Sequence, residues 1–212
     1  FFFTQKTAYA MLRSLVGSEM CIRDRHWDYW GKAVPGYGNP NAKIMILGLA
    51  PAAHGGNRTG RVFTGDKSAE FLFNCLYHSG LANQPNSDHR NDGLELNGYI
   101  TAAVKCVPPG DKPTAKEKNC CKNYLSNEFS LLKDLKVVLG LGKIGFESFL
   151  HFTRTSYEIK MKDYRFKHGV GYELPSGVLL YGAYHPSPRN VNTKRITFDM
   201  MVAFLKQLKN EI

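Results

Sequence analysis

The chain has 212 residues, and its 28 Lys and Arg against 18 Asp and Glu give a formal net charge of +10 at pH 7. This length suits one α/β domain with a full core and leaves little room for two, and the positive charge favours a polyanionic partner such as nucleic acid. Five cysteines without disulfide-scaffold spacing indicate a reducing, cytoplasmic compartment, and no apolar run reaches the ~18 residues of a membrane span.

The first 25 residues differ from the rest of the chain. They contain no helix cap, no clear hydrophobic period and no turn residues that link them to the segment after them. Arg13 breaks their apolar stretch and no small-residue cleavage site comes after it, which argues against a secretory signal. The string SLVGSEMCIRDR looks like a translated sequencing adapter. We therefore expect residues 1–25 to be a non-native, disordered segment, and residues 26–212 to form a single domain.

The most informative segment is residues 48–66, GLAPAAHGGNRTGRVFTGD, which comes directly after a predicted buried strand at residues 43–47. Its glycines, arginines, histidine and terminal aspartate supply almost no apolar surface, so it is predicted to be a ligand-binding loop. Such a loop at the carboxyl end of a parallel strand lies where open α/β sheets bind their ligands. A helix is predicted next, over residues 68–79, with Ser68 as its cap.

The remaining elements alternate between strand and helix. Strands are predicted at residues 99–105, 136–141 and 178–184, and helices at residues 114–132, 142–151 and 194–208. Thr114 and Glu117 form a capping-box pattern at the start of the helix over residues 114–132. The last helix is expected to direct inward Ile196, Met200, Phe204 and Leu208. The alternation predicts an α/β three-layer sandwich, in which helices flank a central four-stranded, mostly parallel sheet.

Four polar clusters lie after the predicted strands, at residues 48–66, 106–114, 140–143 and 184–190, and they are expected to converge on one crevice. In this combination the chain resembles the uracil-DNA glycosylase superfamily, and most closely its family 5. The GLAPAAHGGNRTGRVFTGD segment resembles the family's first motif, YHPSPRN resembles the second, and KCVPPGDKPT and LGLGKIGF also fit. The resemblance runs from about Trp27 to the carboxyl terminus. It implies a DNA glycosylase of base excision repair that releases uracil, and other deaminated bases such as hypoxanthine, without a divalent metal.

Cleavage of an N-glycosidic bond leaves positive charge on the sugar and negative charge on the departing base, so an anion and a hydrogen-bond donor are needed. The resemblance points to Asp66 as the anion, because Ala50 stands where some related families carry Asp or Asn. Asp66 would orient a water or stabilise the sugar cation, but it equally fits the N-cap of the next helix. His185 would donate to a base oxygen, although a lone histidine is more often structural.

The resemblance also suggests residues for base and DNA binding. Phe63 would stack on the flipped base, or else only pack in the core. Asp111 stands where the family commonly has Asn, so it either alters base preference, positions water or is a surface turn residue. The predicted base pocket comprises Gly48, Leu49, Ala50, Pro51, His54, Gly55, Phe63 and Asp111. The predicted contacts to the DNA backbone are Asn57, Arg58, Arg61, Ser187, Arg189 and Asn190.

Relatives of this type hold a [4Fe-4S] cluster on four cysteines. Cys106 and Cys121 match the later pair, although the neighbouring Cys120 leaves that ligand ambiguous. The earlier pair would fall in the adapter-like segment, whose Cys21 we do not count as a ligand. The cluster is therefore expected in the native protein and is incomplete or absent in this chain.

Two other functions stay open. A non-catalytic nucleic-acid-binding or damage-sensing iron–sulfur module would keep the basic surface without needing Asp66. A nucleotide-binding α/β hydrolase is disfavoured, because the chain has neither a G-x-x-x-x-G-K-[ST] nor a clear G-x-G-x-x-G sequence after its first strand. For a glycosylase and for a sensor alike, the partner is DNA containing deaminated bases, and the protein is expected to act as a nucleoid-associated monomer.

Overall fold

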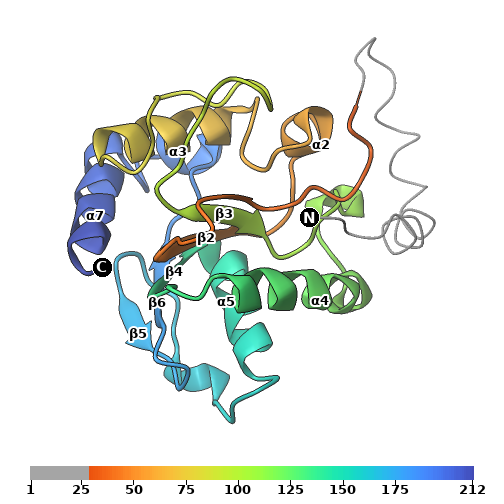
Figure 1. Cartoon of the computed structure of the whole chain (residues 1–212), viewed down its shortest axis with the longest axis vertical. Helices are drawn as coiled ribbons and strands as arrows, with labels where there is room; N and C mark the ends of the chain where they lie inside the picture. Colours follow the sequence, from red (N-terminus) through yellow and green to blue (C-terminus); the bar gives the residue numbers. More distant parts are fainter. Residues whose placement is uncertain (1–28) are drawn as a thin grey trace.

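The computed structural model describes residues 29–212, and Figure 1 shows their arrangement. The predicted non-native segment 1–25 lies outside the described residues. One sheet of six strands runs through the middle of the molecule in the order β1-β3-β2-β4-β6-β5. None of the helices in the described part of the chain combines the length and apolar character needed to cross a bilayer.

Four strands form the parallel centre of the sheet: β3 (Tyr99–Ala102), β2 (Ile44–Gly48), β4 (Val137–Leu141) and β6 (Leu179–Ala183). Every residue of β2 and β4 is buried, as expected for strands covered on both faces. The four predicted strands are confirmed, but the predicted total of four is corrected to six. The short strands β1 (Tyr37–Gly38) and β5 (Gly171–Glu173) pair antiparallel at the two edges and are too short to leave a periodic pattern.

Helices cover both faces of this sheet, which confirms the three-layer α/β architecture (Figure 1). On one face, α3 (Lys67–His78) contacts α7 (Phe198–Asn210), and on the other lie α4 (Ala115–Leu131) and α5 (Gly142–Thr153). Each face has its own hydrophobic cluster. The shorter helical segments are α2 (Gly56–Thr59), η1 (Pro109–Asp111), η2 (Met161–Asp163) and α6 (Pro188–Asn192).

Capping residues set where the helices begin. Thr114 and Glu117 form the predicted capping box of α4. The last helix begins later than predicted, because the Thr197 side chain accepts the backbone N–H of Met200 and starts α7 at Phe198. Met200, predicted to face inward, is 41% exposed.

The inward stripe of α7 consists of Met201, Val202, Phe204, Leu205 and Leu208. The predicted spacing of four residues drifts around a helix that has 3.6 residues per turn. Phe204 and Leu208 are buried as predicted, and Ile196 is buried ahead of the helix rather than within it.

Candidate active site

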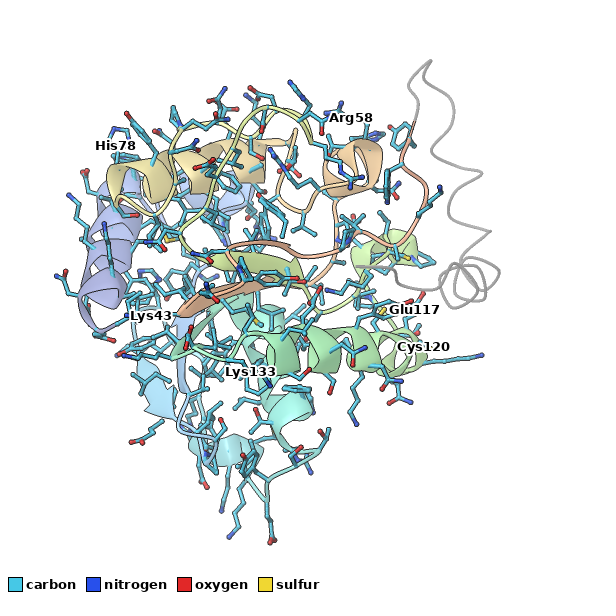
Figure 2. The ribbon with its side chains drawn as sticks, viewed as in Figure 1. Lys43, Arg58, His78, Glu117, Cys120 and Lys133 are labelled. Carbon is cyan, nitrogen blue, oxygen red and sulfur yellow. The ribbon has the colours of Figure 1, made fainter. Side chains whose placement is uncertain are left out.

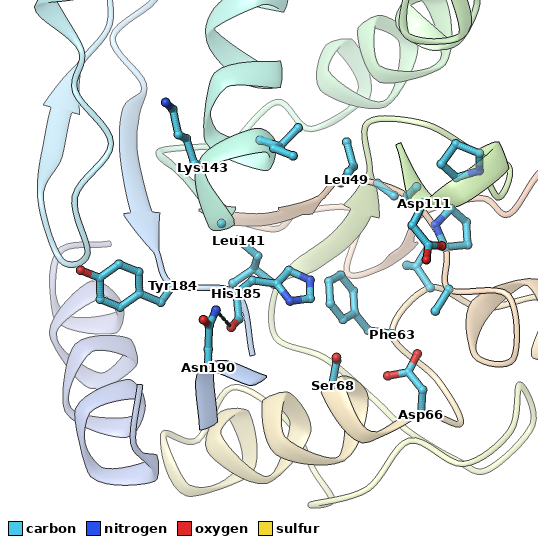
Figure 3. Close-up of a pocket in the computed structure, with 18 of the residues that line it drawn as sticks. Leu49, Phe63, Asp66, Ser68, Asp111, Leu141, Lys143, Tyr184, His185 and Asn190 are labelled. Atoms are coloured by element: carbon cyan, nitrogen blue, oxygen red, sulfur yellow. Dashed lines mark hydrogen bonds between the residues drawn. The ribbon is translucent and has the colours of Figure 1, made fainter. Parts of the chain in front are cut away.

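A cavity of about 460 Å³ opens at the carboxyl edge of the parallel strands, where the four polar clusters meet as predicted (Figure 3). From the segment after β2 it is lined by Leu49, Ala50, Pro51, Ala52, Val62, Phe63, Asp66 and Ser68. From β3 and the segment after it come Ala102, Pro108 and Asp111, and from the end of β4 and the start of α5 come Leu141, Gly142, Lys143 and Ile144. The remaining lining residues are Phe166, Tyr184, His185, Asn190 and Arg195.

Asp66 is both a helix cap and a wall of this cavity. Its Oδ1 accepts the backbone N–H of Ala69 at 2.9 Å, which makes it the N-cap of α3 in place of the predicted Ser68. Ser68 instead lies in the first helical turn and lines the cavity. A Cβ added at Gly55 would collide with the Asp66 carboxylate, so glycine at this position lets the loop backbone approach the charge closely.

Phe63 and His185 lie next to each other in the cavity, with ring centroids 6.2 Å apart and an angle of 36° between the planes (Figure 3). Phe63 is a non-glycine residue at φ +48°, a conformation of low population that is held by its surroundings. A Cβ added at Gly48 would lie 2.8 Å from the Phe63 ring. Phe63 therefore packs against the core and still presents part of its ring to the cavity.

The turn that carries His185 is fixed by several hydrogen bonds. The Asn190 side-chain amide donates to the carbonyl oxygen of His185 at 2.8 Å, and the Ser187 side chain accepts the backbone N–H of Asn190 as the N-cap of α6. On the other side, the backbone N–H of Tyr184 donates to Nδ1 of His168 at 3.2 Å. These contacts hold the His185 backbone from both directions.

Burial lowers the pKa of His185, and the negative charge of Asp66 opposes this shift without cancelling it. The imidazole is therefore neutral at pH 7, with an N–H group that can donate a hydrogen bond. A neutral donor and a carboxylate consequently lie in the same cavity, which is the combination that the predicted chemistry requires.

The predicted site residues divide into two groups. The cavity is lined by Leu49, Ala50, Pro51, Phe63, Asp66, Asp111, His185 and Asn190. Outside its lining lie Gly48, His54, Gly55, Asn57, Arg58, Arg61, Ser187 and Arg189. Gly48 and Gly55 have no side chain, which leaves room for Phe63 and Asp66 respectively. His54 and Arg189 are exposed, and Nδ1 of His54 shares a hydrogen bond with the Tyr29 hydroxyl.

Arg61, predicted to contact DNA, is buried in the interior with only 6% of its surface exposed. Its guanidinium makes a bidentate ion pair with Asp92, at 2.8 and 2.6 Å, and also donates to Ser87 and Thr64. Burial raises the pKa of Asp92, but the hydrogen bonds from Arg61 and from backbone N–H groups outweigh it and hold the pKa at about 2. Arg61 thus ties the loop to the segment before β3. Its partner is 31 residues away in sequence, a distance over which no local pattern predicts pairing.

Some cavity residues were not predicted individually. Lys143 and Tyr184 lie within two of the predicted polar clusters, and that membership was their only signal. Phe166 and Arg195 come from segments that carry no motif. Arg195 places its guanidinium 4.6 Å above the Tyr184 ring, a cation–π contact at the wall of the cavity.

The cysteines of the described residues do not complete a four-thiolate site. Cys106 and Cys121 are buried, and Cys121 Sγ accepts the backbone N–H of Lys105 at 3.4 Å, whereas Cys120, also on α4, is exposed (Figure 2). Cys75 is buried within α3, and burial raises its pKa to about 12. Residues 29–212 contain no group of three or more metal-ligating side chains that could hold a metal ion. These residues alone therefore do not fit a [4Fe-4S] cluster.

Comparison with known proteins agrees with this architecture. The family model described as "Uracil DNA glycosylase superfamily" matches residues 35–209. A type-5 uracil-DNA glycosylase of Pyrobaculum aerophilum is 44% identical over 186 residues, which is 87% of this chain and 79% of that protein. One from Thermus thermophilus is 40% identical over 201 residues, covering 94% of this chain and 89% of that protein. A type-4 uracil-DNA glycosylase of Sulfurisphaera tokodaii is 28% identical over 189 residues, covering 83% and 74%. The chain belongs to the uracil-DNA glycosylase superfamily, and within it to the type-5 family.

Proposed function

We propose that the cavity at the carboxyl edge of the sheet is where this chain, a uracil-DNA glycosylase of DNA repair, hydrolyses the bond between uracil and deoxyribose. The observation that carries the proposal is the presence of the Asp66 carboxylate and the neutral His185 imidazole in one cavity, with the Phe63 ring beside the histidine. A cavity of about 460 Å³ has room for a single extruded base.

In the proposed reaction the base leaves the stack and enters the cavity against Phe63. The bond between the sugar C1′ and the base nitrogen breaks, and its electron pair leaves with the base. His185 donates a hydrogen bond to the base oxygen where this negative charge collects. Because Oδ1 of Asp66 already accepts the Ala69 N–H, we assign the sugar side to Oδ2. That oxygen stabilises the positive sugar and accepts the proton of the water that adds to C1′.

Other residues are proposed to set specificity and hold the DNA. Asp111 lines the cavity as an exposed residue at φ +58°, and we propose that it positions water or tunes the choice among uracil, hypoxanthine and other deaminated bases. Arg58, Ser187 and Arg189 are proposed to contact the backbone, and Asn190 lies at the cavity wall. Burial removes Arg61 and Asn57 from this set. We propose that the protein acts as a monomer on nucleoid DNA in the cytoplasm.

For the cofactor, we propose that the native protein holds an iron–sulfur cluster through Cys106 and Cys121, with the remaining ligands supplied from outside residues 29–212. The burial of both thiols supports this choice over the exposed Cys120. Such a cluster would cross-link the chain after β3 to α4, and no step of the hydrolysis passes through it.

The decisive experiment compares uracil release from a uracil-containing oligonucleotide by the unaltered chain and by Asp66→Asn. Asparagine is as good an N-cap as aspartate, so α3 keeps its start while the negative charge is lost. The single-turnover rate should fall by about 10²- to 10⁴-fold, with a melting temperature close to that of the unaltered chain. Asp66→Ala, which loses both functions, should in addition unfold about 1 kcal/mol more easily.

An equal rate in Asp66→Asn and the unaltered chain would show that Asp66 is only a cap. If the unaltered chain binds uracil-containing DNA but releases no base, the non-catalytic damage-sensing module becomes the better description. Both results come from the same assay, since binding and release are measured on one labelled oligonucleotide.

A further inference from the structure

A second cavity of about 380 Å³ lies between α4 and α5, and it shares no lining residue with the active-site cavity. Its apolar floor includes Ala103, Leu125 and Phe152. Its rim is polar and basic, with Lys118, Asn119 and Lys122 from α4 and His151 from α5. We call this cavity the α4–α5 groove. The two helices that form it pack on the same face of the sheet (Figure 1).

The two lysines of the groove form a like-charge pair. Lys118 and Lys122 are four residues apart and share one face of α4, a spacing at which equal charges destabilise a helix. The ion pairs found among residues 29–212 involve neither of them. An anionic ligand in the groove would remove this repulsion.

The floor of the groove adds an aromatic surface. Phe152 packs against Phe129 and Phe149, with ring centroids 5.3 and 5.6 Å away, and this anchors it while it remains only half-buried at the groove. Proteins bind single-stranded nucleic acid with this combination, because the cationic rim contacts the phosphates and the aromatic ring stacks on the bases.

Two chain segments that line the active-site cavity lead into residues that line the groove. On α5, Ile144 lines the active-site cavity, and Ser148, one turn later, lines the groove and donates to the Ile144 carbonyl at 2.7 Å. On the other wall, Ala115 of the groove lies four residues after Asp111 of the active site. From Ile144 to Phe152 the helix advances about 12 Å. A stacked strand advances about 3.4 Å per nucleotide, so this distance corresponds to roughly three or four nucleotides.

We propose that the α4–α5 groove binds an unpaired stretch of the substrate strand, about three or four nucleotides from the extruded base. Two phosphates lie at Lys118 and Lys122, and a base rests against Phe152. The inference rests on the assignment of DNA as substrate, and it adds a strand path leading from the active site down one side of the molecule.

The test measures equilibrium binding of a fluorescent, uracil-free single strand over a range of salt concentrations. The variant is Lys118→Ala with Lys122→Ala. The matched control is Lys116→Ala with Lys133→Ala, which removes the same charge from α4 and its carboxyl end without touching the groove (Figure 2 shows Lys133). Two lost phosphate contacts should make the slope of log K against log salt shallower by about 1.4 in the groove variant, and the control slope should stay near that of the unaltered chain.

A second measurement records uracil release as the single strand is lengthened on either side of the uracil. For the unaltered chain, kcat/KM should rise as one flank grows from one to about four nucleotides. The groove variant should lose this gain while keeping its kcat on long substrates. Phe152→Leu, which preserves an apolar contact to Phe129 and Phe149, should weaken strand binding about tenfold.

The proposal is overturned if the groove variant and the lysine control show the same salt slope, since the effect would then be one of net charge alone. It is also overturned if lengthening either flank leaves kcat/KM unchanged. Failure of the glycosylase assignment gives a different result, because the unaltered chain would then release no uracil although its binding to the uracil-free strand still depended on the groove lysines.

Discussion

Gly48 has no side chain, and the Phe63 ring occupies the space that a side chain at this position would need. In Gly48→Ala the new Cβ would stand 2.8 Å from that ring, closer than real Cβ contacts allow, so Phe63 must move. We expect uracil release to slow at least about tenfold, and unfolding to become about 1–3 kcal/mol easier because of overpacking. Stopped assays and urea denaturation measure the two effects. Gly98→Ala is the control, since its Cβ would meet its nearest atom at an ordinary 3.4 Å and should change neither quantity much.

Single residues also show what the sequence could and could not foretell. For Asp66 the sequence left open a catalytic anion or a helix cap; the structure has the cap and also places Asp66 in the cavity lining, so the cap does not exclude the proposed role of its carboxylate. Phe63 likewise belongs to the core and to the cavity. For Arg61 the sequence favours an exposed role, because nothing in a polar loop indicates that an arginine will be buried in an ion pair with an aspartate far away in the sequence. A fold must bring Asp92 close before that pairing exists.

At the scale of elements, the Arg61–Asp92 pair joins the active-site loop to the segment before β3 and is almost fully buried. Asp92→Ala should lower the free energy of unfolding by about 3–5 kcal/mol, because it leaves the guanidinium buried without its counter-charge. Urea denaturation provides the measurement. Glu70→Ala breaks the Lys67–Glu70 pair, whose side chains are 77% and 66% exposed, and should leave the free energy of unfolding almost unchanged. Equal losses in the two variants would contradict the structural role of Arg61.

Elements with a strong local signal are predicted well from sequence, and weak ones are not. The central strands are continuous apolar runs, and α4 carries its capping box, so both were found. The strands β1 and β5 have only two and three residues, and their pairing depends on the neighbouring strand rather than on their own pattern. In α7 the Thr197 cap moves the start from the predicted residue 194 to Phe198, and the predicted four-residue spacing misplaces Met200 on a helix with 3.6 residues per turn.

At the scale of the whole molecule, two histidines link stability to pH. Burial lowers the pKa of His168 and, against the opposing charge of Asp66, that of His185, from an ordinary 6.5. Below about pH 6.5 these histidines bind protons more readily in the unfolded chain than in the folded chain. The folded state is therefore fully stabilised above this pH, and that stability is lost as the pH falls towards the lower pKa values of the folded state. The melting temperature should drop between about pH 7.5 and about pH 5.

His168→Asn should reduce this drop, because it removes one titrating group and offers an amide oxygen to the Tyr184 N–H. A melting temperature whose pH dependence is the same in His168→Asn and the unaltered chain would rule out His168 as a source of the effect.

The two antiparallel edge strands have a consequence for how the protein behaves in a crowded cell. An exposed sheet edge is a template on which another chain can add a strand, and long flat edges promote aggregation. Here the sheet ends in β1 and β5, which present only two and three residues. With so few unpaired backbone groups, the edges offer a neighbouring copy almost no hydrogen bonds for adding a strand. The same architecture that gathers the cavity-lining loops at one end of the strands thus leaves little backbone at the sides of the sheet on which another chain could add a strand.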